Sequence, residues 1–262
     1  MEDSSNQSND PKPVPREGAW AQPVSRLKVG EVPAGATNIN IDGRQTVSAL
    51  QGFGQLWQKT YRIRLTSVNA SPAEVMRVWK ENFPKYHPPD SRFYPPMTGI
   101  KAGEVLFIEG IIPAFPGSPS ILPVTSGVRV IYVDEESFTI MTPEGFPEAG
   151  WNTFSTYDDD GCVVAQVQSM ARAADPIYEI YLRYLGSAEW QERVWTTVLS
   201  NLGAEFGVRG QVTMAKTCLD PKLQWPEAKN VFQNAGMRTV FYKLGAPLRW
   251  VRRQFKGPAN SV

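Results

Sequence analysis

The single histidine is the first candidate for a catalytic residue. His87 is the only side chain whose ordinary pKa, about 6.5, suits proton transfer at neutral pH. It lies between Tyr86 and a pair of prolines, and the sequence places no carboxylate beside it to orient the ring as a general base. We therefore favour a structural role for His87 over a catalytic one.

Two groups of acidic residues are the next candidates. Asp158, Asp159 and Asp160 are consecutive, whereas a calcium loop spaces its oxygen ligands at alternate positions, so the triplet indicates a hairpin turn and no metal site. Glu144 and Glu148 flank Gly-Phe-Pro and would form an acid and base pair only if both pointed into one cavity. Glutamates in such turns are usually exposed, and we expect both to face solvent.

Residues 162–173 form a predicted strand whose two faces differ. One face carries Gln166, Gln168 and Arg172, and the other carries small apolar residues. The polar face either meets solvent, as is usual in antiparallel sheets, or offers hydrogen-bonding groups to a ligand. Both alternatives stay open, and the three residues are kept as candidate ligand-binding positions.

Aromatic residues are abundant in the predicted elements. Most of them should be core, but aromatic side chains also line small-molecule pockets. We predict that the walls of a pocket include at least two of Trp79, Phe107, Trp151 and Trp195. The chain contains no glycine-rich phosphate loop and no recognisable nucleophile with a base, so no catalytic residue and no cofactor is assigned.

The overall composition narrows the class of protein. The 262 residues include 27 basic and 26 acidic side chains, so no global field attracts nucleic acid. Cys162 and Cys218 are far apart, which favours neither a disulfide framework nor a zinc site, and a reducing cytoplasm fits best. The polar first ten residues lack the features of a secretion signal, and no apolar run approaches the roughly 20 residues that span a bilayer.

Four regions follow one another along the chain. Residues 1–15 are predicted to be a disordered tail, and residues 16–54 an extension with a hairpin at 37–47 around Asp42-Gly43. Residues 55–207 form the main domain. Residues 208–262 form a C-terminal extension that has no acidic residue after Asn230 and interleaves basic with apolar side chains. That segment either packs on the domain, which we favour, or contacts an anionic membrane surface or a partner.

Capping residues locate the helices of the main domain. The Ser-Pro-Ala-Glu motif at residues 71–74 is a capping box that starts one helix, and Asp175-Pro176 starts another, which Gly186-Ser187 interrupts. The last helix, residues 187–206, has a stripe of two aromatic and four aliphatic side chains that needs a large apolar partner.

Alternating segments predict the sheet that covers this stripe. They are residues 56–66, 104–112, 126–133, 137–142, 151–157 and 162–173. Short polar turns join them, which favours antiparallel hairpins, and prolines in residues 113–123 argue against a central strand there. The predicted fold class is α+β, a curved antiparallel sheet wrapped around a long C-terminal helix.

This order of elements resembles the SRPBCC, or START-like helix-grip, superfamily, which includes lipid-transfer domains, polyketide cyclases and birch-pollen-allergen-like proteins. The resemblance covers residues 55–207 and rests on Ser-Pro-Ala-Glu-Val after the first strand and on Met-Thr-Pro-Glu-Gly-Phe-Pro-Glu-Ala-Gly-Trp at 141–151. The chain is also similar to uncharacterised actinobacterial members with polyketide cyclase-like sequences. The resemblance implies a cavity between sheet and helix, but not whether that cavity binds, transports or catalyses.

Three hypotheses follow. The leading one is binding of a hydrophobic small molecule, lipid or polyketide-like, in an internal cavity. The second is a cyclase or dehydratase type of enzyme that uses the same cavity. The third is a peripheral-membrane or protein-interaction module that acts through the basic C-terminal segment.

Overall fold

One antiparallel sheet organises the protein. The computed structural model describes residues 18–113 and 120–245. The strand order is β3-β4-β5-β6-β7-β8-β2-β9, with β1 paired to β5, and every pairing is antiparallel. The strands are β1 (Ala19–Trp20), β2 (Leu56–Leu65), β3 (Ser91–Tyr94), β4 (Val105–Pro113), β5 (Ser120–Val133), β6 (Ser137–Met141), β7 (Glu148–Asp159), β8 (Cys162–Ala173) and β9 (Thr213–Asp220).

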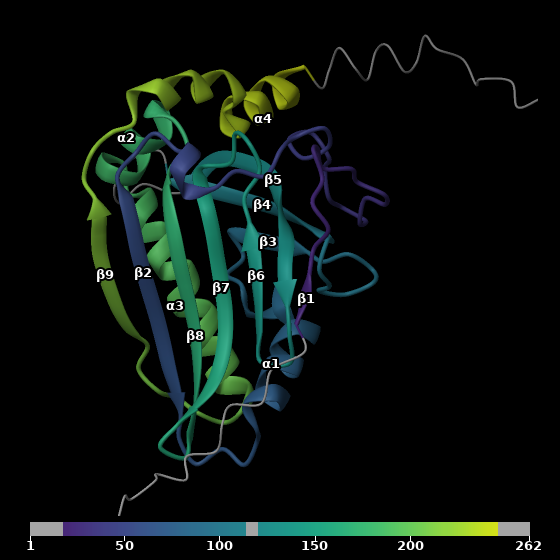
Figure 1. Ribbon diagram of the computed structural model, residues 1–262, viewed down its shortest axis with the longest axis vertical. Coiled ribbons are helices and arrows are strands. Elements are labelled where there is room, and N and C mark those ends of the chain that lie inside the picture. Colours follow the sequence, from purple (N-terminus) through teal and green to yellow (C-terminus); the bar gives the residue numbers. More distant parts are fainter. Residues whose placement is uncertain (1–17, 114–119, 246–262) are drawn as a thin grey trace, which may run out of the picture.

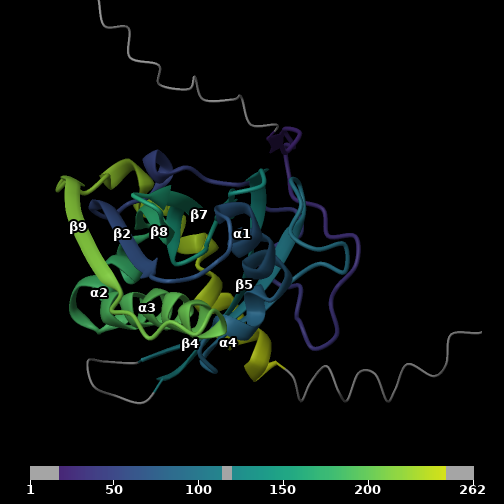
Figure 2. The same ribbon diagram turned by 90° about the horizontal axis from the view of Figure 1, so that it is seen from below.

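The sheet curves around one long helix, as the sequence predicts. This helix, α3 (Ser187–Glu205), lies along the concave face of the sheet (Figures 1 and 2). The other helices are α1 (Pro72–Glu81), α2 (Pro176–Tyr184) and α4 (Ala235–Leu244), with 3-10 segments η1 (Ala49–Gln51), η2 (Phe83–Tyr86) and η3 (Trp225–Gln233). In Figure 1, α1 lies at the lower end of the sheet, and α2 and α4 lie at the upper end.

Capping hydrogen bonds and backbone conformation confirm the predicted helix starts. The Ser71 hydroxyl accepts a hydrogen bond from the Glu74 backbone N–H at 3.2 Å, which caps α1. The Asp175 carboxylate accepts from the backbone N–H groups of Ile177 and Tyr178 and caps α2. Gly186 separates α2 from α3 in a left-handed conformation, with φ at +80°.

The lower end of the concave face is solid. We call it the filled half, because buried large side chains of the sheet, α1, η2 and the C-terminal part of α3 pack against one another there. Its members are Tyr61, Ile63, Leu65, Trp79, Phe83, Phe138, Phe154, Val198, Leu199 and Leu202, and none is more than 1% exposed. The aromatic rings meet edge to face or stacked, with Phe138 and Phe154 4.5 Å apart at their centroids.

Three details of the sheet differ from prediction. Residues 37–47 form no hairpin, because this segment pairs with Leu27: the Gly43 N–H donates to the Leu27 carbonyl, and the Leu27 N–H donates to Arg44. β5 begins at Ser120, within the proline-rich segment. Pro123 is tolerated there because β6 pairs only with residues 129–133 of β5, so the first part of β5 has β4 as its one strand partner. β3 and β9 were not predicted.

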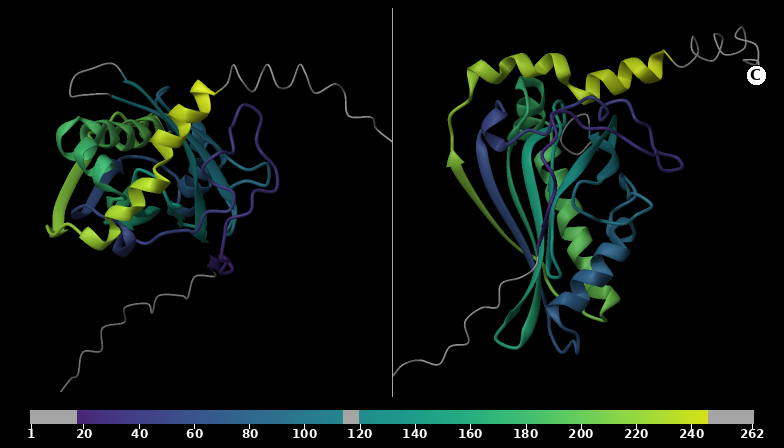
Figure 3. Two further views of the ribbon diagram at one scale, coloured as in Figure 1. Left: turned by 90° about the horizontal axis from the view of Figure 1, so that it is seen from above. Right: turned by 45° about the vertical axis from the view of Figure 1, so that its right-hand side comes forward.

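The C-terminal extension crosses the upper end of the sheet. β9 adds to β2 at the sheet edge, and η3 and α4 then run across the top of the molecule (Figure 3). The predicted tail at 1–15 and the basic residues Arg249, Arg252, Arg253 and Lys256 lie outside the described residues. Among residues 18–113 and 120–245, no helix is both long and apolar enough to cross a lipid bilayer.

Candidate ligand cavity

A cavity occupies the upper end of the concave face. It lies between strands β3 to β7, α2 and the N-terminal part of α3, and its volume is about 100 Å³. We call this region the hollow half. Apolar side chains form most of its walls, among them Phe93, Ile108, Val128, Ile140, Val194 and Trp195.

Small residues explain why this half is hollow. Two of the residues that face the cavity are Gly110 of β4 and Ser126 of β5. The corresponding inward-facing positions in the filled half carry aromatic or branched side chains. A Cβ atom at Gly110 would lie 3.4 Å from the Trp190 ring, an ordinary contact distance, so the indole lies directly beside this strand position. Trp190 is held there because its Nε1 donates to Asp90 at 3.0 Å. The lining is therefore set by a rigid strand and an anchored ring.

A polar chain of three residues forms one wall. Lys59 Nζ of β2 donates to Gln191 Oε1 at 2.7 Å, and Gln191 Nε2 of α3 donates to Glu148 Oε2 of β7. Gln191 and Glu148 both line the cavity. Burial raises the pKa of the Glu148 carboxyl, which Lys59 and Gln191 partly offset, and burial lowers the pKa of the Lys59 ammonium. The chain thus places a carboxyl of raised pKa at the edge of an apolar space.

Several polar atoms around the cavity have spare hydrogen-bonding capacity. Asn152 lies opposite Ser169, which in turn lies opposite Lys59, so a polar row crosses β7, β8 and β2 on the concave face. Asn152 Oδ1 and Ser187 Oγ are buried, and neither has a hydrogen-bond partner among the described residues. Both residues line the cavity. A ligand in the cavity could satisfy these atoms.

The structure brings one of the four candidate aromatics to the cavity. Trp195 lines it. Trp79 belongs to the filled half, where its ring meets Phe154 edge to face at 5.6 Å. Phe107 lies on the outer face of β4, in a cluster with Leu27 and Ile41, and Trp151 is on the outer face of β7. The role predicted for these three as cavity walls has no support in their positions.

The polar face of β8 also turns away from the cavity. Val163, Ala165 and Val167 take the concave face, so Gln166, Gln168 and Arg172 point outward. Gln166 Oε1 accepts from Arg62 at 2.7 Å.

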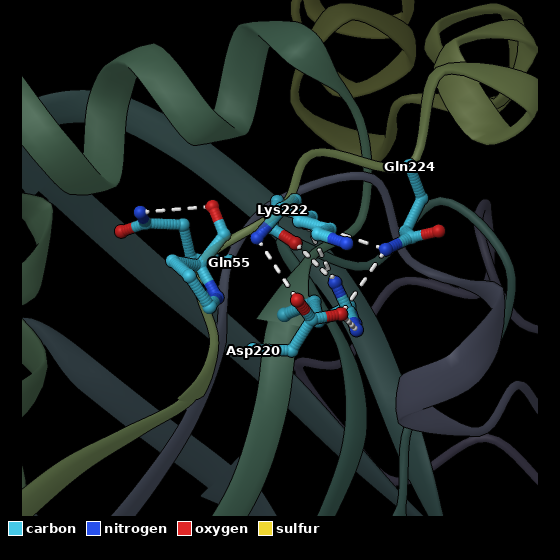
Figure 4. A network of polar contacts seen from close by, with 7 residues as sticks. Gln55, Asp220, Lys222 and Gln224 are labelled. Atoms are coloured by element: carbon cyan, nitrogen blue, oxygen red, sulfur yellow. Dashed lines mark hydrogen bonds and ion pairs between the residues drawn. The ribbon is translucent and has the colours of Figure 1, made fainter.

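Arg172 joins β8 to the C-terminal extension. It donates to the carbonyls of Gly54 and Lys222 and pairs with Asp220 at 2.6 Å. Figure 4 shows this network, in which Gln224 also donates to Asp220. The guanidinium is buried by these contacts and acts as a structural clamp.

The acidic residues considered as candidates lie in different parts of the structure. Glu148 lines the cavity, contrary to the expected exposure, while Glu144 accepts from the Gln45 N–H outside it, so the two do not form a pair. The aspartate triplet forms the predicted turn, in which Asp160 and Gly161 have positive φ values of 55° and 75°. Within the described residues, no cluster of three or more metal-ligating side chains exists.

The contacts of His87 indicate a structural role for this residue. Its Nδ1 lies 2.9 Å from the Phe83 carbonyl, so this nitrogen carries the proton and donates it. The ring packs against Phe83 and Phe93, and burial lowers the pKa of His87 to about 3. The imidazole is therefore neutral at physiological pH.

Sequence reasoning missed the polar wall of the cavity. The alternation that places Tyr61, Ile63 and Leu65 inward also places Lys59 inward, so its position was available from the pattern. Gln191 and Asn152 gave no such signal, because a glutamine on a helix and an asparagine on a strand are ordinary surface residues.

The fold is that of the helix-grip proteins: an antiparallel sheet closes around one long helix and leaves a cavity between them. No family model matches the chain, and no curated protein matches its sequence. Solved structures of similar fold include the KanY protein, with 12% identity over 63% of this chain and 99% of that chain and a TM-score of 0.42. Protein Ms6760 from Mycobacterium smegmatis has 12% identity over 62% and 96%, with a TM-score of 0.38.

A third similar structure is the di-domain ARO/CYC StfQ from the steffimycin biosynthetic pathway. It has 10% identity over 58% of this chain and 50% of that chain, with a TM-score of 0.41. These similarities concern the fold. The function is argued below from the cavity itself.

Proposed function

We propose that the protein binds a small, mostly apolar molecule in the cavity of the hollow half. The observation that supports this most directly is the lining: apolar side chains enclose the space, and a few polar groups converge on one wall, which is the usual composition of a small-molecule site. In the filled half, by contrast, the side chains between the sheet and α3 are buried against one another.

The size of the cavity limits the ligand. A cavity of roughly 150 Å³ lined by aliphatic and aromatic residues binds benzene, and ligand pockets in general measure about 300–1,000 Å³. At about 100 Å³ this cavity is smaller than that example, so it suits a short chain, and one ring would fit after a small outward shift of its walls. A polyketide-like or lipid ligand would require the walls to separate. The wall most able to move is α2, because it contributes only Tyr178, Tyr181 and Leu182 and joins α3 through Gly186.

A paired substitution tests the proposal. Ile108→Trp puts a large ring into the cavity from β4, and Ile111→Trp puts the same ring on the outer face of that strand, where Ile111 is 42% exposed. Native mass spectra of the purified protein would detect a retained ligand, and NMR titration with toluene or benzyl alcohol would detect binding. We expect Ile108→Trp to lose binding and Ile111→Trp to keep it. Equal binding by both folded variants would place the ligand elsewhere.

A second candidate function is acid–base catalysis in the same cavity. The observation that favours it is Glu148, since burial raises the pKa of this carboxyl at the wall of an apolar site, and such groups serve as general acids or bases in enzymes. If a ligand is recovered, incubation with the wild-type protein and with Glu148→Gln should show whether it is changed. A product formed equally by both would exclude this role for Glu148.

A third candidate is contact with a membrane surface through η3 and α4. Phe232, Phe241 and Leu244 are exposed there, next to the exposed basic residues Arg238 and Lys243. Sedimentation with anionic liposomes at low salt tests this contact, and a double change of Phe232 and Phe241 to serine should abolish it. Absence of binding by the wild-type protein would remove this candidate.

A further inference from the structure

Among the described residues, the polar wall of the cavity offers unpaired acceptors, while the Nε1–H of the lining residue Trp195 is an unpaired donor. Glu148 uses one carboxylate oxygen to accept from Gln191, and its other oxygen accepts from none of the residues that the structure describes. Asn152 Oδ1 is a second free acceptor, and the Ser187 hydroxyl can either donate or accept. A guest that fills this space should therefore bring a hydrogen-bond donor, because an acceptor-only guest would leave these oxygens unpaired.

Lys59 fixes the orientation of the Gln191 side-chain amide in this wall. Its ammonium donates to the carbonyl oxygen of Gln191, so the amide nitrogen of Gln191 must point to Glu148. With the amide held in this way, a flip that would offer Glu148 a second acceptor is disfavoured. Lys59 acts through Gln191 and is a positioning residue.

Two lysines match Glu148 and Glu192 in charge without any guest, and Glu189 leaves one negative charge in excess outside the cavity. Lys59 and Lys216 are positive, and Glu148 and Glu192 are negative, with Lys216 3.0 Å and Lys59 3.8 Å from Glu192. Glu189 of α3 and the Glu179–Arg183 pair of α2 face the same region from outside the cavity. A neutral donor leaves the balance unchanged, whereas an ammonium group would add a charge to a mostly apolar space.

We propose that the cavity recognises a neutral hydroxyl group, on a single-ring or short-chain apolar molecule, by donation of that hydroxyl to Glu148. This assignment rests on the proposed binding function and specifies its ligand class as an alcohol or phenol.

Four probes of similar size test the assignment in the wild-type protein. They are benzyl alcohol, which donates; benzaldehyde, which only accepts; toluene, which does neither; and benzylamine, which is cationic. Titration at one pH, followed by NMR shifts or by fluorescence of the indole groups, gives the four dissociation constants. We expect benzyl alcohol to bind about tenfold more tightly than the other three, as a hydrogen bond to a carboxylate would provide.

Glu148→Gln should reverse the preference. Gln191 still donates toward position 148, so the new amide must turn its oxygen to Gln191 and its NH₂ group toward the guest. Benzaldehyde should then bind better than benzyl alcohol. Glu144→Gln is the matched control, because Glu144 lies four residues away and outside the cavity, and it should keep the wild-type order.

The outcomes separate this assignment from the binding proposal. If the folded wild-type protein binds none of the probes, the binding proposal itself fails for ligands of this size. If toluene binds as tightly as benzyl alcohol, or if benzylamine binds best, the cavity binds ligands but the hydroxyl assignment is wrong. If Glu148→Gln is unfolded by circular dichroism, the wild-type order of affinities still decides the matter.

Discussion

The two halves of the concave face share α3 and the strands β6 and β7, yet one is packed with large side chains and the other contains a cavity. In the filled half, aromatic rings such as Phe138 and Phe154 stack between the sheet and α1. In the hollow half, positions on neighbouring strands carry Gly110, Ser126 and Asn152, and a cavity of about 100 Å³ is left beside them. The two halves therefore differ in the side chains that face α3 and in the helix that covers the sheet, which is α1 in the filled half and α2 in the hollow half.

Aromatic side chains occur in both halves, so their number alone does not locate the cavity. In the filled half the rings pack against one another, and their dispersion contacts stabilise the fold. In the hollow half, Phe93, Trp190 and Trp195 line a space that also borders small residues and the polar groups of β7 and α3. The packed core and the proposed binding site thus lie toward opposite ends of α3.

The largest expected effect is the loss of unfolding free energy when an isoleucine is replaced by alanine, and it should differ between the two halves. Ile63→Ala in the filled half should lower the free energy of unfolding by about 4 kcal/mol, because the neighbouring rings cannot collapse into the space. Ile108→Ala in the hollow half should cost about 2 kcal/mol, since its side chain already borders a cavity. Urea denaturation measures both. Equal losses would mean that the hollow half is as tightly packed as the filled half.

A smaller effect concerns the boundary between the halves, where His87 packs against Phe83 and Phe93. The pKa of the folded imidazole is lowered to about 3, while the unfolded chain binds a proton below about pH 6.5. The unfolded state therefore binds more protons, and stability falls as pH falls. Between pH 7 and 5 this loss should be about 2 kcal/mol.

His87→Phe isolates this contribution, because the phenyl ring keeps the packing and does not titrate. The difference in unfolding free energy between wild type and variant should shrink by that amount as the pH is lowered from 7 to 5. A difference that stays constant over this range would show that the ring becomes protonated in the folded protein.

The smallest effect contrasts the starts of two helices. α1, in the filled half, has the Ser71 cap, whereas α3 begins in the hollow half after Gly186 without a capping side chain. Ser71→Ala should cost about 1 kcal/mol in unfolding free energy. Ser200→Ala, at an exposed interior position of α3, is the control and should cause no loss. A loss at Ser200 as large as that at Ser71 would show that the capping bond contributes nothing.

Local signals predicted the fold well because they act over a few residues. The caps at Ser71 and Asp175, the break at Gly186 and the alternation of β2 and β8 each depend on neighbours in the sequence. Two local signals were outweighed by distant partners. The Asp42-Gly43 turn hydrogen-bonds to Leu27 instead of closing a hairpin. Pro123 lies within β5, at a position where only one neighbouring strand, β4, pairs with it.

The sequence by itself determined that a curved antiparallel sheet covers a long apolar helix, because periodicity and capping fix the elements and their buried faces. The tertiary structure alone decided where space remains. Which face of β8 turns inward, and the meeting of Lys59, Gln191 and Glu148 from three separate elements, depend on strand register and on the position of α3. A cavity is a difference between the volume enclosed by the backbone and the volume of the side chains, and no short stretch of sequence carries that difference.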